Sequence, residues 1–180
     1  MNASPTHYPD PTRLEPVNRH TLAVVVDNEP GVLARISGLF SGRGYNIESL
    51  TVTETEHERH ISRITIVTTG TNAVIEQIKS QLERLVPVHR VVDLTLQGEA
   101  MERELCLVKV VGHGDHRVEA LRLAAAFGAR TLDATLTSFV FELTGATEDI
   151  ERFIALMTVV GLVEVSRTGI AAMGRGAEGM

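Results

Sequence analysis

One order of hydrophobic patterns, namely strand, helix, strand, strand, helix, strand, occurs twice along this chain. Strands are predicted where apolar residues cluster or alternate, and helices where apolar residues recur on one face at helical spacing. The first copy has strands at 20–27, 45–55, 59–69 and 88–94 and helices at 30–43 and 72–85. The second has strands at 103–111, 131–136, 138–144 and 162–167 and helices at 115–127 and 147–160. This repetition predicts an α+β chain of two tandem ferredoxin-like (βαββαβ) domains.

Residues with strong positional preferences mark several helix ends. Pro30 is expected in the first helical turn, where its missing N–H costs nothing and its fixed φ suits a helix start. Gly44 is expected to end that helix in a left-handed conformation. Thr71 or Asn72 is expected to cap the second helix, and Thr147 the fourth.

Polar stretches divide the chain into five parts. Residues 1–18 are polar and Pro-rich and predict a flexible extension. The two domains are expected at 19–96 and 103–172, joined by a polar linker at 97–102, and a Gly-rich tail covers 173–180. In each domain both helices would cover one face of the sheet, so we expect the other face or edge to meet a partner, with self-association as the default.

Composition narrows the class of protein. Of 180 residues, 43% are hydrophobic and 22% charged, which is typical of a chain that folds around apolar cores. A net charge of −6 disfavours a nucleic-acid partner. No apolar run reaches the roughly 18 residues of a membrane span, so we expect a soluble, cytoplasmic protein with no membrane partner. Cys106 is the only cysteine, which excludes an intrachain disulfide and predicts a buried thiol.

The segment that follows the first strand has the features of a small-anion site. Asp27 and Asn28 end an apolar strand, and Gly31 leaves backbone N–H groups unshielded at the start of an amphipathic helix. Free N–H groups and the positive end of the helix dipole favour a carboxylate or phosphate by roughly 0.3 to 2 kcal/mol. An ordinary helix start would use the same residues.

A second segment, at 43–50, begins the next strand and contains Asn46 and Ile47. A helix of about 14 residues at 1.5 Å per residue would separate Asn46 from Asn28 by roughly 20 Å. Both can therefore contact one small ligand only if they come from different subunits of a two-fold dimer. Asn46 would equally fit an ordinary turn before a strand.

Such a shared pocket would suit a small hydrophobic amino acid. The N–H groups of Gly31 and Val32 would hold its carboxylate, and the amides of Asn28 and Asn46 would orient its ammonium or carboxylate. Ile47 and nearby aliphatic residues would contact its side chain.

Other polar combinations do not indicate catalysis or metal binding. His57 and His60 flank a predicted hairpin turn, and His113 and His116 flank a loop, without a Cys or acidic cluster that would complete a metal site. Ser41 and Ser49 lack a His and Asp arrangement for a nucleophile. We therefore expect no catalytic residue and no cofactor or metal in this chain.

Longer stretches of the chain resemble one known family. It is the regulatory (small) subunit of acetohydroxyacid synthase, also called acetolactate synthase, and the resemblance extends over about residues 20–176. The stretches that carry it are 28–35, 38–41, 43–50, 63–66, 77–82, 103–110 and 165–170. The second half matches less closely, and the extension at 1–18 lies outside the match.

The resemblance implies an N-terminal ACT domain, which dimerises and binds amino acids between its copies, and an ACT-like C-terminal domain. It implies a separate catalytic subunit that carries thiamine diphosphate, Mg²⁺ and FAD and makes acetolactate for valine, leucine and isoleucine biosynthesis. This chain would then be a non-catalytic subunit that raises the partner's activity and confers feedback inhibition, usually by valine, with leucine or isoleucine as alternatives. The effector residues carried over are Asn28, Gly31 and Val32 from one subunit and Asn46 and Ile47 from the other.

Three other functions are alternatives to this one. A free-standing ACT-type amino-acid sensor would bind the same ligand without a catalytic partner. An RNA-recognition module shares the βαββαβ order, but the strands at 20–27 and 59–69 contain no aromatic residue on which a base could stack. A small ferredoxin-like phosphatase would need a paired Arg and Asn in the anion loop, where only Asn28 is present.

Overall fold

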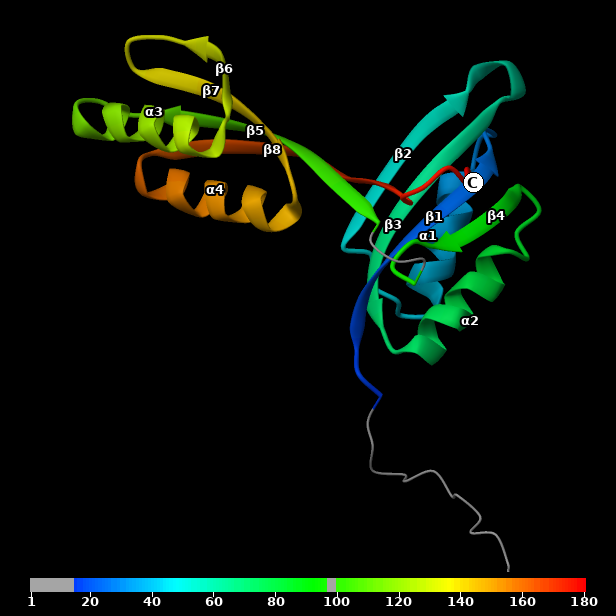
Figure 1. The fold of residues 1–180 in the computed structure, drawn as a ribbon. Helices are drawn as coiled ribbons and strands as arrows, with labels where there is room; N and C mark the ends of the chain where they lie inside the picture. The colour runs from blue at the N-terminus through cyan, green and yellow to red at the C-terminus, as the bar shows by residue number, and fades with distance from the viewer. Residues whose placement is uncertain (1–14, 97–99) are drawn as a thin grey trace, which may run out of the picture.

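The chain forms two four-stranded antiparallel sheets, each with two helices on one face, in a computed structural model that describes residues 15–96 and 100–180 (Figure 1). The first half comprises β1 (Asn18–Asp27), α1 (Val32–Gly42), β2 (Ser49–Glu56), β3 (Ile61–Gly70), α2 (Asn72–Leu82) and β4 (Val88–Asp93), with a short 3₁₀ turn, η1 (His57–Arg59), between β2 and β3. The second half comprises β5 (Met101–Val111), α3 (Asp115–Phe127), β6 (Arg130–Ala134), β7 (Ser138–Gly145), α4 (Thr147–Val159) and β8 (Leu162–Met173).

The two sheets have the same topology. Their strand orders are β2-β3-β1-β4 and β6-β7-β5-β8, and all pairs are antiparallel. The repeated βαββαβ order and the α+β class predicted from the hydrophobic pattern are confirmed. None of the helices in the described part of the chain is long and apolar enough to cross a membrane.

Alternation along each strand places one set of side chains against the helices. In β1, Leu22, Val24 and Val26 pack with Ile36 of α1 and Ile78 of α2 in the first core. The second core is built in the same way around fully buried residues of β5, β7 and α4, namely Cys106, Val108, Phe141, Ile150 and Phe153. The predicted burial of Cys106 is confirmed, and burial raises the pKa of its thiol.

Two predicted helix starts are wrong. Helix α1 begins at Val32, so Pro30 lies before the helix, and Gly31 is the N-cap residue with φ 89°. A left-handed residue is needed there because the chain must turn sharply from β1 into α1, and glycine adopts that φ without strain. The N-cap of α4 is Ala146 and not Thr147, because the carbonyl of Ala146 already accepts the first helical bonds from the N–H groups of Asp149 and Ile150.

Other helix ends agree with the sequence. Gly44 has φ 71° after α1, and Thr71 caps α2 by accepting a hydrogen bond from the N–H of Val74 at 3.4 Å. Strand β2 begins at Ser49, four residues later than predicted, because Tyr45 still bonds back to the carbonyl of Phe40 at the end of α1.

Strand β8 is six residues longer than predicted, and this extension joins the two halves. It pairs with β5 as far as Met101 opposite Met173, so a two-stranded ribbon extends from the second sheet to the first (Figure 1). The end of the ribbon lies on the face of the first sheet that carries no helices. There Ile170 and Ala172 are buried against Ala23, Val67 and Val92.

The ribbon covers part of the face that was expected to meet a partner. Arg63 of β3 donates a hydrogen bond to the carbonyl of Ala172 at 2.7 Å, and Thr21 of β1 bonds the carboxylate of Glu102. The chain thus supplies from β5 and β8 part of the cover that we expected from another molecule. Residues 1–14 of the expected extension and 97–99 of the expected linker lie outside the described residues. Of the described ones, Asn18 begins β1, and Met101 and Glu102 begin β5, so this strand starts earlier than expected.

Candidate functional site

Three of the predicted effector residues lie where β1 leads into α1, with Asn28 and Gly31 in the turn and Val32 as the first residue of the helix. The backbone N–H of Asn28 donates to the carbonyl of His60 at 2.6 Å, which ties this turn to the β2–β3 connection. Asn28 and Gly31 are exposed, whereas the side chain of Val32 is buried in the first core. The N–H of Val32 donates a long hydrogen bond of 3.4 Å to the carbonyl of Glu29, so a ligand that binds this N–H would have to replace that bond.

Glu54 lies beside this turn and was missed by the sequence analysis. Its carboxylate is 2.7 Å from Nδ1 of His57 and 3.7 Å from Nδ1 of His60. The hydrogen bond from His57, followed by one from the Asn28 amide, lowers the pKa of Glu54. A carboxylate at this position favours a positively charged group nearby, such as an ammonium. The signal in the sequence was weak, because Glu54 is one of three glutamates around an exposed polar turn.

Asn46 and Ile47 lie between α1 and β2. The carbonyl of Asn46 accepts a hydrogen bond from the Thr68 hydroxyl at 2.6 Å, and the N–H of Glu48 donates to the carbonyl of Val67 at 2.8 Å. The side chain of Asn46 is exposed, and Ile47 is half-buried against the first core. These hydrogen bonds connect the backbone here to β3, and the Asn46 side chain faces solvent.

The strand register separates these two groups of residues. Asp27, next to Asn28, is opposite Ile61, whereas Thr68, which bonds Asn46, is opposite His20. Positions 20 and 27 are seven residue steps apart along β1, a span of about 24 Å at the rise of an antiparallel strand. One chain therefore brings Asn28, Gly31 and Val32 together at one end of its sheet and Asn46 and Ile47 at the other.

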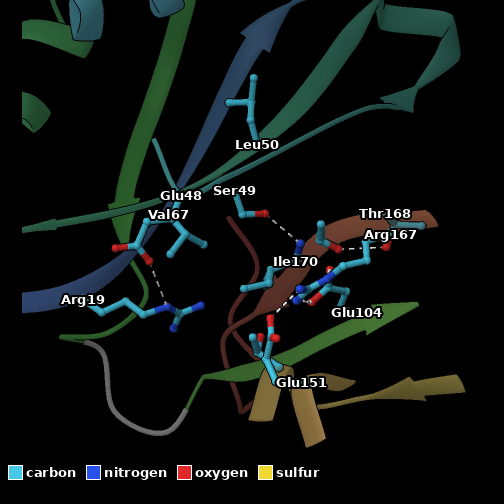
Figure 2. Close-up of a pocket in the computed structure, with 12 residues that line it drawn as sticks. Arg19, Glu48, Ser49, Leu50, Val67, Glu104, Glu151, Arg167, Thr168 and Ile170 are labelled. Atoms are coloured by element: carbon cyan, nitrogen blue, oxygen red, sulfur yellow. Dashed lines mark hydrogen bonds and ion pairs between the residues drawn. The ribbon is translucent and has the colours of Figure 1, made fainter. Parts of the chain in front are cut away.

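A cavity of about 480 Å³ lies where the ribbon meets the first sheet (Figure 2). The first half contributes Arg19, Glu48, Ser49, Leu50 and Val67, and the second contributes Glu104, Thr147, Glu151, Arg167, Thr168, Gly169 and Ile170. Sequence reasoning did not find this cavity, because it forms only where two domains distant in sequence meet.

Ion pairs line the cavity. Arg167 donates two hydrogen bonds to the carboxylate of Glu104, at 2.7 and 2.8 Å, and also pairs with Glu151. Glu104 is only 4% exposed, and these carboxylates raise the pKa of Arg167. On the other side, Arg19 lies 3.7 Å from Glu48 and 3.1 Å from Glu102.

The histidines that the sequence singled out are exposed. His57 and His60 lie beside Glu54, and His113 and His116 lie in and just after the connection between β5 and α3. No group of three or more His, Cys, Asp or Glu residues in the described ranges 15–96 and 100–180 could hold a metal ion.

Both halves of the chain match family models. The model described as the AHAS small subunit-like ACT domain matches residues 22–90, and the one described as the small subunit of acetolactate synthase matches residues 103–176. The first match confirms the ACT domain that was expected in the N-terminal half.

Known proteins resemble the chain over most of their length. A probable acetolactate synthase small subunit of Archaeoglobus fulgidus is 46% identical over 158 residues, which cover 88% of this chain and 98% of the relative. The acetolactate synthase isozyme 3 small subunit of Salmonella typhimurium is 44% identical, over 88% of this chain and 96% of the relative. The crystal structure of the acetolactate synthase small subunit from Thermotoga maritima superimposes with a TM-score of 0.82 at 36% identity, covering 89% of this chain and 99% of that one. The chain therefore belongs to the family of acetolactate synthase small subunits.

Proposed function

We propose that this chain is the regulatory subunit of an acetolactate synthase. It binds the catalytic subunit, raises its activity and confers feedback inhibition by a branched-chain amino acid, with valine as the expected effector. Family membership over both halves supports a small-subunit role. Thiamine diphosphate, Mg²⁺ and FAD are expected on the catalytic partner and not on this chain.

The effector site is proposed to lie between the N-terminal domains of a homodimer. The observation that carries this proposal is the separation of about 24 Å between the two groups of effector residues along β1. A valine molecule is far shorter than that distance. In a two-fold dimer, Asn28, Gly31 and Val32 of one chain would face Asn46 and Ile47 of the other, which gives two equivalent sites.

The chemistry of each group suits one part of an amino acid. Backbone N–H groups at the start of α1 would receive the carboxylate. Glu54, next to Asn28, adds a negative charge that favours the ammonium group. Ile47 would contact the aliphatic side chain.

Inhibition is proposed to work by linkage. Valine stabilises one arrangement of the paired N-terminal domains (residues 19–96). In that arrangement the small subunit raises the activity of the catalytic subunit less. By reciprocity, the active holoenzyme must bind valine more weakly than the inhibited one does.

The site assignment is tested by Gly31→Asp with Gly31→Asn as its control. Both variants place a side chain of nearly equal size at φ 89°, in a position that is otherwise open, so they differ mainly in charge. An aspartate carboxylate about 4 Å from that of valine costs about 4 kcal/mol at an effective dielectric constant near 20, or about a thousandfold in affinity. Valine titration of the holoenzyme should show lost inhibition in Gly31→Asp and retained inhibition in Gly31→Asn. Equal inhibition in both variants would defeat the assignment.

The sharing of the site between two chains is tested by mixing Gly31→Asp chains with Asn46→Ala chains. A mixed dimer carries both changes in one site and neither in the other, so about a quarter of all sites are intact after random exchange. Valine binding, absent from each variant alone, should return in the mixture. If binding does not return although mixed dimers form, the site does not combine residues of two chains.

A further inference from the structure

We propose that Glu48 and Ser49 are positioning residues that transmit effector binding to the C-terminal half of the chain through the β5–β8 ribbon. This inference rests on the proposed function, because it concerns how occupancy of that same effector site reaches the rest of the molecule. It assigns a role to the cavity between the two halves. This cavity is not part of the effector site.

Glu48 and Ser49 directly follow the predicted effector residues Asn46 and Ile47. Any movement of the loop that holds the amino acid therefore moves these two side chains. Ser49 contacts one strand of the ribbon directly, and Glu48 is linked to the other strand through Arg19.

Ser49 contacts β8. Its hydroxyl oxygen accepts a hydrogen bond from the N–H of Ile170 at 3.1 Å (Figure 2). Gly169 makes this close approach possible, because a Cβ there would lie 2.8 Å from the Ser49 hydroxyl and 2.9 Å from that of Thr51. Ile170 itself is 4% exposed and packs with Val67 and Ala23 on the first sheet.

Glu48 reaches β5 through Arg19. Its carboxylate bonds the Thr69 hydroxyl and pairs with Arg19, and Arg19 also pairs with Glu102 of β5 at 3.1 Å. Figure 2 shows the Arg19–Glu48 pair on one side of the cavity and the Ser49–Ile170 bond on another. The 48–49 dipeptide thus holds both strands of the ribbon.

The surroundings let this contact rearrange. A cavity of about 480 Å³ lies next to it and leaves room for the polar side chains at this contact to move. The Arg19 and Glu48 side chains are 40% and 37% exposed, so water can replace their pairing at small cost. In the cavity wall, Arg167 of β8 pairs with the buried carboxylate of Glu104 of β5, and this pair links the two strands.

The inference is tested in the reconstituted holoenzyme with Ser49→Ala, Glu102→Gln and Gly169→Ala. Gly176→Ala is a matched control for Gly169→Ala, because both glycines have positive φ (97° and 81°) but Gly176 has no atom within 4 Å of an added Cβ. Three quantities are measured for each variant: valine affinity of the isolated small subunit by calorimetry, activation of the catalytic subunit, and the midpoint of valine inhibition.

We expect the three junction variants to keep valine affinity within about twofold and to keep activation, while the inhibition midpoint rises about tenfold or more. That range follows from couplings of about 5- to 150-fold that are usual between linked sites. Gly176→Ala should match the unaltered chain in all three quantities. A merely structural role would lower affinity, activation and inhibition together.

Two outcomes would overturn the inference, and they can be told apart. Undiminished inhibition in all three junction variants would overturn it while leaving the proposed effector site intact. Absence of valine binding and inhibition in the unaltered holoenzyme would overturn the proposed function, and this inference with it.

Discussion

Glu54 shows how a single side chain can change the chemistry of a predicted site. The sequence placed Asn28 near the start of α1 as a polar group that orients an amino acid. In the fold, β2 brings the Glu54 carboxylate to the same place, where it accepts hydrogen bonds from His57 and from the Asn28 amide. The predicted ligand environment therefore contains an acid as well as the amides.

The lowered pKa of Glu54 gives a prediction for stability against pH. A carboxyl group whose folded pKa lies below its ordinary value of 4.5 stabilises the fold above that value. This contribution is lost as the pH falls through the lowered folded pKa. Thermal unfolding should therefore show Glu54→Gln to be less stable than the unaltered chain at pH 6, with the difference shrinking toward pH 3.

Glu58→Gln, in the neighbouring turn η1, is the control for this prediction, because it removes the same charge from an exposed side chain. The difference in stability between Glu58→Gln and the unaltered chain should change less between pH 6 and pH 3. A Glu54→Gln difference that is constant from pH 6 to pH 3 would contradict the role assigned to His57 and Asn28.

Helices α2 and α4 occupy equivalent places in the two halves but begin differently. Thr71 caps α2 with its hydroxyl, whereas Ala146 at the start of α4 has no side chain that could do so. Ala146 nevertheless has the extended backbone of a capping residue, with φ −69° and ψ 155°. The start of α4 therefore has the backbone geometry of a capped helix but lacks the hydrogen bond from a capping side chain.

This difference predicts opposite effects of two substitutions. Thr71→Ala should lower the free energy of unfolding by about 1 kcal/mol, and Ala146→Ser should raise it by a similar amount or somewhat less. Urea unfolding monitored by circular dichroism would measure both. No stabilisation in Ala146→Ser would mean that the free N–H groups of α4 already have equivalent partners.

The β5–β8 ribbon makes the two halves one molecule. It buries Ile170 and Ala172 on the first sheet, and hydrogen bonds such as the one from Arg63 to the carbonyl of Ala172 add to this contact. The apolar contact should therefore supply most of the free energy that couples the unfolding of the two halves.

Ile170→Ala tests this expectation. The loss of a buried isoleucine side chain should cost about 2 to 5 kcal/mol, and it should separate the unfolding of the two halves in a calorimetric scan. Leu136→Ala serves as the control, because Leu136 is 89% exposed in the second half and its loss should change little. A single unchanged transition in Ile170→Ala would show that the halves are coupled elsewhere.

Much of the fold was predictable because local patterns and tertiary packing agree. Leu22, Val24 and Val26 alternate in sequence and all face the helices, so the strand and its buried face follow from the same residues. Thr147 failed as a predicted cap because residue preference does not reveal which backbone carbonyl starts the helix. The extension of β8 was not predicted, because Ile170 and Ala172 become buried only against the other sheet.

The candidate site, too, was predictable only in part. The sequence alone could place Gly31 at a helix start and Asn46 after the helix end, and the helix length between them required that they lie far apart. The assignment of these residues to an effector stays a prediction. Glu54 could not be assigned to the site beforehand, because its position depends on the pairing of β2 with β3.

By itself, the order of apolar and polar residues determined the two βαββαβ units, their helix-covered cores and the opposite placement of the two effector segments. These properties depend on periodicity within short segments, which each segment carries in its own residues. Only the tertiary structure decided that the β5–β8 ribbon crosses to the first sheet, that Gly169 lies against Ser49 and that a cavity forms where the halves meet. Such contacts depend on which surfaces remain unburied after each unit has folded, and no segment encodes that alone.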